Sequence, residues 1–215
     1  MQKIKALIFD LDGTIANTLP LCILAFRNSI EPLINRSLSD EEIIATFGPS
    51  EEGTIKALAP GYYEKGVNDY LQYYQALHYM CPQVFDGIKE MLTFLQSKSV
   101  HIAMVTGKGK YSTDISLKHF DIKIFFEFIE TGSPHGPIKA KGIQTVLDQW
   151  PGIKKDEVIY VGDSTGDIEA SRKAGIPVIA ASWAETAEPE KLKQFQPDEI
   201  FYTIQDFSNW LYAKI

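Results

Sequence analysis

The pattern of apolar residues changes character twice along the chain. A short apolar run at Ala6–Phe9 is bounded by turn residues and has the length of a buried parallel strand. From Val84 onward, strand-like apolar runs alternate with segments whose apolar residues recur at helical spacing. Between Ile15 and Pro82 only helical patterns occur. The sequence therefore predicts an α/β protein whose sheet is interrupted, after its first strand, by a helical insertion.

The alternating part predicts a doubly wound parallel sheet with a Rossmann-like arrangement, formed by residues 1–15 and 83–215. Further strands are expected at Val100–Val105, Ile124–Ile129, Glu157–Val161, Pro177–Ala181 and Glu199–Tyr202. Helices are expected at Val84–Ser97, Tyr111–His119, Lys139–Trp150, Thr165–Ala174, Pro189–Phe195 and in the segment through Trp210.

Residues 16–82 are expected to form a small α-helical domain of their own. Its helices are predicted at Leu19–Ile34, Asp40–Phe47, Glu51–Leu58 and Tyr63–Tyr79. Because this insertion leaves the sheet directly after the first strand, we expect a lid that is hinged there and closes over the ligand-binding edge of the sheet.

Composition bounds the possible partners. The chain has 215 residues, 45% apolar and 23% charged, and no apolar stretch approaches the ~20 residues that cross a bilayer. A net charge of −7 without a visible basic face argues against nucleic acid as the main partner and leaves small anionic substrates possible where positive charge is local. Met1–Lys5 runs straight into the first strand, and the two cysteines do not suggest a disulfide scaffold. We therefore expect a cytoplasmic protein without a membrane partner, as a monomer or a weak homodimer.

Two aspartate clusters follow two of the predicted strands. Asp10 and Asp12 come after the first strand, and Asp163 and Asp167 follow the strand that ends at Val161. The carboxyl ends of parallel strands form the crevice in which open α/β sheets bind ligands. Carboxylates gathered there predict a site for a divalent cation and a phosphate group. Aspartates also cap turns and helix N-termini, but two clusters at one crevice favour the functional interpretation.

The spacing within each cluster fits distinct tasks. Asp10 and Asp12 are two residues apart, so both side chains leave the same side of an extended chain. One carboxylate can then attack as a nucleophile while the other transfers a proton to and from the leaving oxygen. Asp163 and Asp167 are four residues apart and can meet on one face of a beginning helix. Hard oxygen ligands of this kind suit Mg²⁺.

A threonine and three lysines complete the candidate chemistry. Thr106, Gly107 and Lys108 follow the second predicted strand, where a hydroxyl and flexible backbone N–H groups can hold phosphoryl oxygens. A plain glycine turn explains the same residues. Lys139 and Lys141 precede a helix, and an ammonium group there can neutralise crowded carboxylates, although most lysines only solvate a surface.

These motifs, in this order, resemble the haloacid dehalogenase superfamily, and within it the phosphatases close to phosphoglycolate phosphatase and β-phosphoglucomutase. Asp10–Thr14 resembles the first family motif, Thr106 the second, a helix-leading lysine the third and Gly162–Asp167 the fourth. The resemblance covers almost the whole chain, and the helical insertion resembles the family's cap domain. It implies a Rossmann-like core with an inserted helical cap.

The resemblance also implies roles for the site residues. Asp10 would be the nucleophile that forms an aspartyl-phosphate, and Asp12 the general acid and base. Mg²⁺ would be bound by Asp10, the main-chain carbonyl of Asp12 and Asp163, with Asp167 as a further ligand or the partner of a ligand. Thr106 would hydrogen-bond the phosphoryl group. The presence of Asp12 favours a phosphate ester over a carbon–halogen or carbon–phosphorus bond as the substrate.

The lysine of the third motif has two candidates. Relatives often carry Lys-Pro there, whereas the segment Pro137–Gly142 contains two lysines. Helix register favours Lys139 as the catalytic lysine, with Lys141 as the alternative. Substrate or phosphate binding is assigned to Leu11, Gly107, Lys108 and Lys141.

The cap segment Phe47–Glu52 resembles the substrate-facing loop of relatives, and a surface turn capped by Ser50 explains the same residues equally well.

Together, the motifs predict a Mg²⁺-dependent phosphatase that hydrolyses a small phosphomonoester. A phosphosugar mutase of the β-phosphoglucomutase kind is the alternative, and a non-catalytic protein that binds phosphorylated metabolites is a third hypothesis. The substrate stays open because the side chains that select it belong to the cap.

Overall fold

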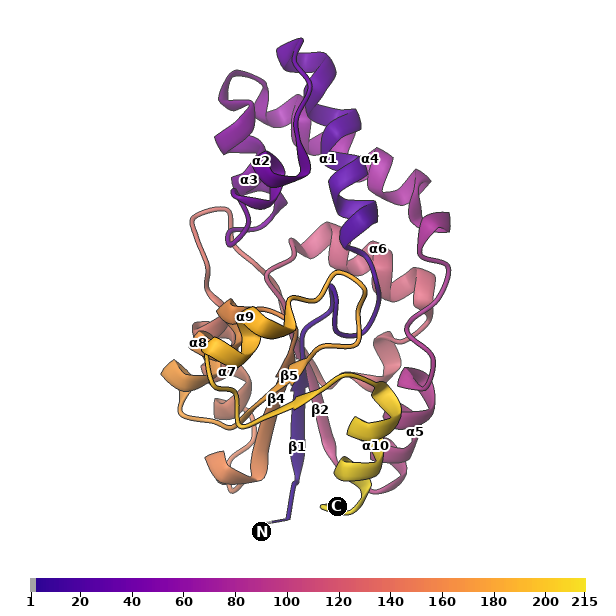
Figure 1. Ribbon diagram of the computed structural model, residues 1–215, viewed down its shortest axis with the longest axis vertical. Helices are drawn as coiled ribbons and strands as arrows, with labels where there is room; N and C mark the ends of the chain where they lie inside the picture. Colours follow the sequence, from indigo (N-terminus) through magenta and orange to yellow (C-terminus); the bar gives the residue numbers. More distant parts are fainter. Residues whose placement is uncertain (1–2) are drawn as a thin grey trace.

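The computed structural model describes residues 3–215, and in this part of the chain six parallel strands form one sheet (Figure 1). In chain order they are β1 Ala6–Phe9, β2 His101–Val105, β3 Phe128–Glu130, β4 Val158–Gly162, β5 Val178–Ala181 and β6 Glu199–Phe201. The order across the sheet is β3-β2-β1-β4-β5-β6, so β1 lies between β2 and β4. The predicted doubly wound α/β fold is confirmed.

Helices cover both faces of the sheet because both sets of alternating side chains in the central strands are apolar. In β1, Leu7 and Phe9 belong to one buried cluster, and Ala6 and Ile8 belong to the other. The first cluster contains residues of α5 Ile88–Ser97, α6 Lys110–Phe120 and α10 Ile204–Tyr212. The second contains residues of α7 Lys139–Asp148, α8 Thr165–Ala174 and α9 Pro189–Gln194.

The insertion between β1 and β2 is helical, as predicted, and lies over the carboxyl ends of the strands (Figure 1). Its helices are α1 Leu19–Ile34, α2 Asp40–Ile44, α3 Glu51–Leu58 and α4 Tyr63–Ala76, with 3₁₀ turns at Pro60–Tyr62 and His78–Met80. Tyr70 and Tyr74 of α4 are fully buried, and the ring of Tyr70 lies 4.4 Å from that of Phe26 in α1. Aromatic packing therefore holds α1 against α4. The domain limits at residues 16 and 82 stay a prediction.

Some predicted elements differ in extent. The helix expected from Val84 begins at Ile88, directly after Gly87, whose φ of 91° is left-handed. The first half of the strand expected at Ile124–Ile129 is wrong, because Lys123–Phe125 forms a 3₁₀ turn. The helix ends expected at Phe47, Tyr79 and Trp150 lie at Ile44, Ala76 and Asp148.

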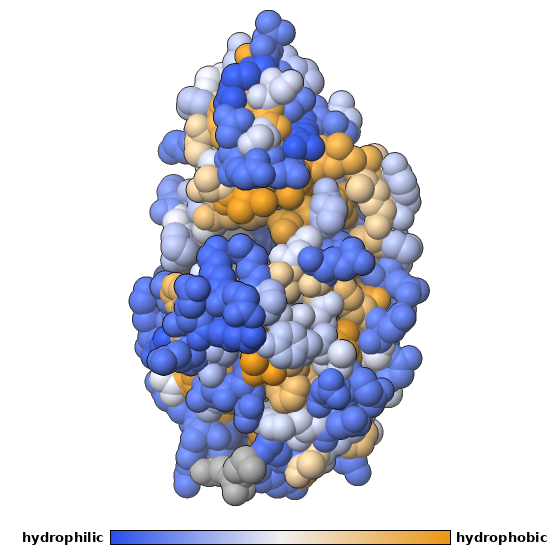
Figure 2. Space-filling model, in the orientation of Figure 1, coloured by the Kyte–Doolittle hydropathy of each residue, from blue (hydrophilic) through white to orange (hydrophobic). Residues whose placement is uncertain are grey.

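On the face shown in Figure 2, the surface is mostly hydrophilic at the tip of the cap and around the core, with apolar residues along the lower edge of the cap. Among the helices of residues 3–215, none is both long and apolar enough to cross a membrane. Both cysteines, Cys22 and Cys81, are free and buried.

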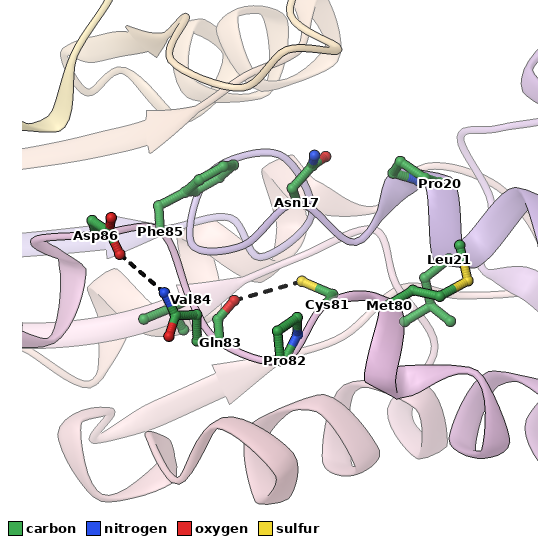
Figure 3. A pocket seen from close by; sticks show the side chains of 10 residues that line it. All are labelled: Asn17, Pro20, Leu21, Met80, Cys81, Pro82, Gln83, Val84, Phe85 and Asp86. Atoms are coloured by element: carbon green, nitrogen blue, oxygen red, sulfur yellow. Dashed lines mark hydrogen bonds between the residues drawn. The ribbon is translucent and has the colours of Figure 1, made fainter.

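The two linkers between core and cap line an open pocket of about 390 Å³ (Figure 3). The N–H of Phe85 in the second linker donates to the carbonyl of Ile15 before the first, over 3.0 Å. The pocket is lined by Asn17, Pro20 and Leu21 on one side and by residues 80–86 on the other.

Candidate active site

The ends of three adjacent strands bring the predicted residues to one edge of the sheet. Asp10 follows β1, Thr106 follows β2 and Asp163 follows β4. Backbone hydrogen bonds fix this edge: the N–H of Asp10 donates to the carbonyl of Val161 over 2.9 Å, and that of Thr106 to the carbonyl of Glu130 over 3.0 Å. The side chains therefore project from a rigid part of the core.

Asp10 is buried, with 4% of its surface exposed, and both of its carboxylate oxygens have partners. Oδ1 accepts a 2.7 Å hydrogen bond from the backbone N–H of Leu11. Oδ2 lies 2.6 Å from the ammonium nitrogen of Lys139. Burial raises the pKa of Asp10 to about 6, against the opposing charge of Lys139. The carboxylate is thus oriented and poorly hydrated, as a nucleophile needs to be.

Lys139, and not Lys141, faces the aspartates. Lys139 begins α7, and its Nζ lies 2.5 Å from Oδ1 of Asp167 as well as beside Asp10. Lys141 is exposed on the same helix. Although burial lowers the pKa of Lys139, the carboxylates of Asp10 and Asp167 outweigh this effect and raise it above its ordinary value. Lys139 therefore stays charged and reduces the repulsion between the two carboxylates.

Asp10, Asp163 and Asp167 form a compact set of possible metal ligands. One carboxylate oxygen from each residue lies within 4.8 Å of the others. Loss of hydration and the charges of Asp167 and Asp10 raise the pKa of Asp163 well above its usual value. Gly13 makes room for this carboxylate, since its φ is 74° and a Cβ there would overlap the Asp163 side chain. Crowded hard oxygen donors in a cradle without a Cβ fit a small divalent cation such as Mg²⁺.

Asp167 has more hydrogen-bond partners than the other carboxylates of this set. Its side chain is completely buried, and its Oδ2 accepts hydrogen bonds from the backbone N–H and the hydroxyl of Ser164, at 3.0 and 2.6 Å. In return, the hydroxyl of Ser164 accepts from the N–H of Asp167, which forms a capping box at the start of α8. The hydroxyl of Tyr160 lies 2.9 Å from Oδ1. Asp167 therefore caps α8 and at the same time belongs to the set of three carboxylates that could hold a metal ion.

The side chain of Asp12 stands apart from this set. Its Oδ1 accepts a hydrogen bond from the hydroxyl of Thr18, the residue that precedes α1. Its Oδ2 lies 3.5 Å from Nζ of Lys108. About a quarter of the side chain, 28%, is exposed, compared with 6% for Asp10. Asp12 is thus a partly hydrated carboxylate beside the buried one, an arrangement suited to carrying a proton.

The predicted residues in the turn after β2 do not all face the same part of the molecule. Thr106 is buried, and its hydroxyl accepts a 3.2 Å hydrogen bond from the N–H of Lys108. A Cβ at Gly107 would lie 3.5 Å from Cε of Lys139, so this glycine lies beside the lysine that contacts Asp10. The ammonium group of Lys108 instead points into the cap, 3.2 Å from Glu51. The phosphate-binding role of Leu11, whose N–H is engaged by Asp10, and that of Lys108 stay predictions.

Residues 7–181 match the family model described as haloacid dehalogenase-like hydrolase. The chain belongs to this family. It is therefore a hydrolase, and the predicted identity as an enzyme is confirmed. The match spans both aspartate clusters and the whole helical insertion.

Individual members of the family resemble the chain over nearly its full length. It is 28% identical to the pyrophosphatase PpaX of Halalkalibacterium halodurans over 95% of each chain. A haloacid dehalogenase-like hydrolase from Streptococcus pneumoniae is 28% identical and superposes with a TM-score of 0.77, over 96% of this chain and 98% of the other. A predicted phosphoglycolate phosphatase from Haemophilus somnus, 21% identical, shares the fold with a TM-score of 0.78 over 100% of both chains.

Tyr160 and Thr18 escape sequence reasoning at this site, and Glu51 lies in the cap segment Phe47–Glu52 that the sequence singled out, but its contact with Lys108 was not predicted. Tyr160 is part of an apolar strand, Thr18 precedes a helix, and Glu51 begins another helix in the cap. Each contacts a predicted site residue: Tyr160 contacts Asp167, Thr18 contacts Asp12, and Glu51 contacts Lys108. A tyrosine within an otherwise aliphatic buried strand is the one signal that was available, because a buried hydroxyl requires a partner.

Proposed function

We propose that the chain is a Mg²⁺-dependent phosphatase that hydrolyses a small phosphomonoester through an aspartyl-phosphate. The observation that carries this proposal is the contrast between Asp10 and Asp12. Asp10 is buried and charge-compensated by Lys139, whereas Asp12 is partly hydrated and lies outside the set of three carboxylates. One carboxylate is thus prepared for attack and the other for proton transfer.

In the first step, a carboxylate oxygen of Asp10 attacks the phosphorus atom and the bond to the leaving oxygen breaks. Asp12, protonated, gives its proton to that oxygen, so the product leaves as an alcohol. In the second step, Asp12, now a carboxylate, removes a proton from a water molecule that attacks the phosphorus of the aspartyl-phosphate. Inorganic phosphate is released, and Asp10 and Asp12 return to their initial states.

The remaining residues position and neutralise the transferred group. The carboxylates of Asp10, Asp163 and Asp167 and the main-chain carbonyl of Asp12 would hold Mg²⁺, which would shield the repulsion between carboxylate and phosphate. Lys139 contributes a positive charge beside the nucleophile, and Thr106 contributes a hydroxyl at the same edge of the sheet. Both stabilise charge that develops on the phosphoryl oxygens.

A panel of phosphorylated metabolites, assayed for phosphate release with Mg²⁺ and with a chelator, tests this function. Pyrophosphate belongs in the panel because one relative is a pyrophosphatase by name. We expect Mg²⁺-dependent phosphate release from at least one small monoester, and none with the Asp10→Asn variant. Phosphate release by Asp10→Asn equal to that of the wild type would refute an aspartyl-phosphate at this residue. Isomerisation of a sugar phosphate that needs a bisphosphate activator, without net phosphate release, would favour the mutase alternative.

A further inference from the structure

Lys108 belongs to the core, but its side chain ends inside the cap. Its Nζ lies 4.2 Å from the centre of the Tyr74 ring and 3.2 Å from Sγ of Cys22. The same atom lies 3.2 Å from Oε1 of Glu51. These partners come from α4, α1 and α3 of the cap, and only 1% of the lysine side chain is exposed. The ammonium group therefore has almost no surface left for a substrate.

Glu51 is the matching anchor on the cap side. Its carboxylate is buried and accepts hydrogen bonds from the backbone N–H of Gly109, at 2.5 Å, and from the hydroxyl of Ser112. Both donors belong to the N-terminal end of α6, where free N–H groups and the helix dipole favour a negative charge. A Cβ at Gly109 would overlap this carboxylate, so a glycine is needed for the close approach.

The ion pair between Lys108 and Glu51 extends to the active site. Oδ2 of Asp12 lies 3.5 Å from Nζ of Lys108, and its Oδ1 is held by Thr18. The ammonium is thus a charged group that contacts Asp12 on one side and a cap carboxylate on the other.

We propose that Lys108 is a positioning residue through which the seating of the cap orients Asp12 for proton transfer, with Glu51 as the anchor. This inference rests on the proposed phosphatase function and replaces phosphate binding as the role of Lys108. When the cap moves away, Glu51, Cys22 and Tyr74 leave Lys108, and the ammonium becomes accessible to water. Asp12 then loses the fixed partner of its Oδ2, and only the hydrogen bond from Thr18 to Oδ1 still orients its carboxylate.

The first experiment uses the dependence of the rate on the leaving group. In a Lys108→Met variant, kcat/KM is measured for the best alkyl phosphate of the metabolite panel and for p-nitrophenyl phosphate. This parameter reports transfer of the phosphoryl group to Asp10, where an alkoxide leaving group needs a proton and p-nitrophenolate does not. Lys110→Met is the matched control, because Lys110 is exposed and lies two residues along the chain.

We expect Lys108→Met to lower kcat/KM about 100-fold for the alkyl phosphate and less than about tenfold for p-nitrophenyl phosphate, because general acid catalysis supplies at least that difference. Equal losses for both substrates would show a structural role alone and overturn the proposal, as would no loss for either. If Lys108→Met does not fold, Glu51→Gln is expected to show the same difference between substrates, and the same outcomes decide.

The second experiment does not depend on catalysis. Amide hydrogen exchange of residues 107–112 reports the bond from Gly109 to Glu51. We expect exchange about fivefold faster in Glu51→Gln, since a charge-assisted hydrogen bond is about twice as strong as a neutral one, and unchanged exchange in Lys110→Met. Unchanged exchange in Glu51→Gln would overturn the anchor. If the wild type releases phosphate from no compound, the phosphatase function fails, while this measurement still decides the contact between cap and core.

Discussion

Replacing Lys139 with methionine removes the positive charge between the nucleophile and its neighbour while keeping most of the side-chain volume. The ammonium nitrogen lies 2.6 Å from Asp10 and 2.5 Å from Asp167, whose side chains are 6% and 0% exposed. Without it, two buried carboxylates face each other and Asp163, all within 4.8 Å. We expect the metal-free variant to be markedly less stable than the wild type.

The magnitude follows from charge and burial. At 2.6 Å and an effective dielectric constant of about 20, one of these ion pairs has a Coulomb energy of about 6 kcal/mol. Desolvation of the charges offsets part of this energy, and removing one partner of a buried pair costs about 3–5 kcal/mol. For a chain of this size, that loss lowers the melting temperature by about 6–20 °C.

Thermal unfolding in the presence of a chelator provides the assay, with Lys141→Met as the control. Lys141 is exposed on the same helix, so its replacement is expected to change stability by about 0.5 kcal/mol or less. The experiment also decides between the two lysines of the third motif. A loss of stability in Lys141→Met that equals or exceeds that of Lys139→Met would refute the reasoning.

The pH dependence sharpens this test. The pKa of Asp10 in the wild type is about 6, raised from 3.8, and loss of Lys139 raises it further. A carboxyl whose pKa is higher in the folded than in the unfolded protein does not change the stability at pH values below its unfolded pKa. As the pH rises from the unfolded pKa to the folded pKa, the carboxyl lowers the stability progressively, and above the folded pKa the loss is complete. The deficit of Lys139→Met is therefore expected to be large near pH 8 and to shrink towards pH 4. A deficit that is independent of pH would contradict a charge effect.

Three further predictions concern the nucleophile and the metal site. Asp10→Asn is expected to lower kcat by about 10⁴-fold or more, measured on the best substrate of the panel, and near-normal turnover would contradict its role. Mg²⁺ is expected to raise the melting temperature more at about pH 8 than at about pH 5, because the raised pKa values of Asp163 and Asp10 make the cation compete with protons at low pH, and equal shifts would argue against these ligands. Gly13→Ala is expected to cost about 1–2 kcal/mol in thermal unfolding and to weaken this Mg²⁺ effect, since its φ is 74° and its Cβ would overlap Asp163, whereas an unchanged Mg²⁺ effect would show that the cradle is not needed.

The strands that are buried on both faces were the easiest part of the fold to predict, because such strands appear as continuous apolar runs. Ala6–Phe9 is found with the expected bounds. The strand predicted at Ile124–Ile129 was wrong in its first half because Ile124 is apolar but 78% exposed, so an apolar residue does not indicate burial there. Val84 is buried in a linker and not on a helix, which a pattern of apolar residues alone does not distinguish.

The site was predictable where backbone topology alone brings residues together. Asp10, Thr106 and Asp163 directly follow neighbouring parallel strands, so their proximity follows from the order of the sheet. Thr18 and Glu51 approach from the cap, whose placement over the core depends on contacts between distant segments. A single sequence carries no periodicity that reports such contacts.

The two lysines near the aspartates differ in the same way: one is positioned by the core alone and the other by the cap as well. Lys139 begins a core helix and compensates Asp10, whereas Lys108 contacts Asp12 and is buried by the cap. Each aspartate of the first motif therefore has its own positive partner, and only one of these partners depends on the position of the cap. In the proposed mechanism, the environment of Asp10 as nucleophile is complete within the core. The environment of Asp12 as proton carrier would be complete only with the cap seated, which would couple proton transfer to the leaving group with the enclosure of the substrate.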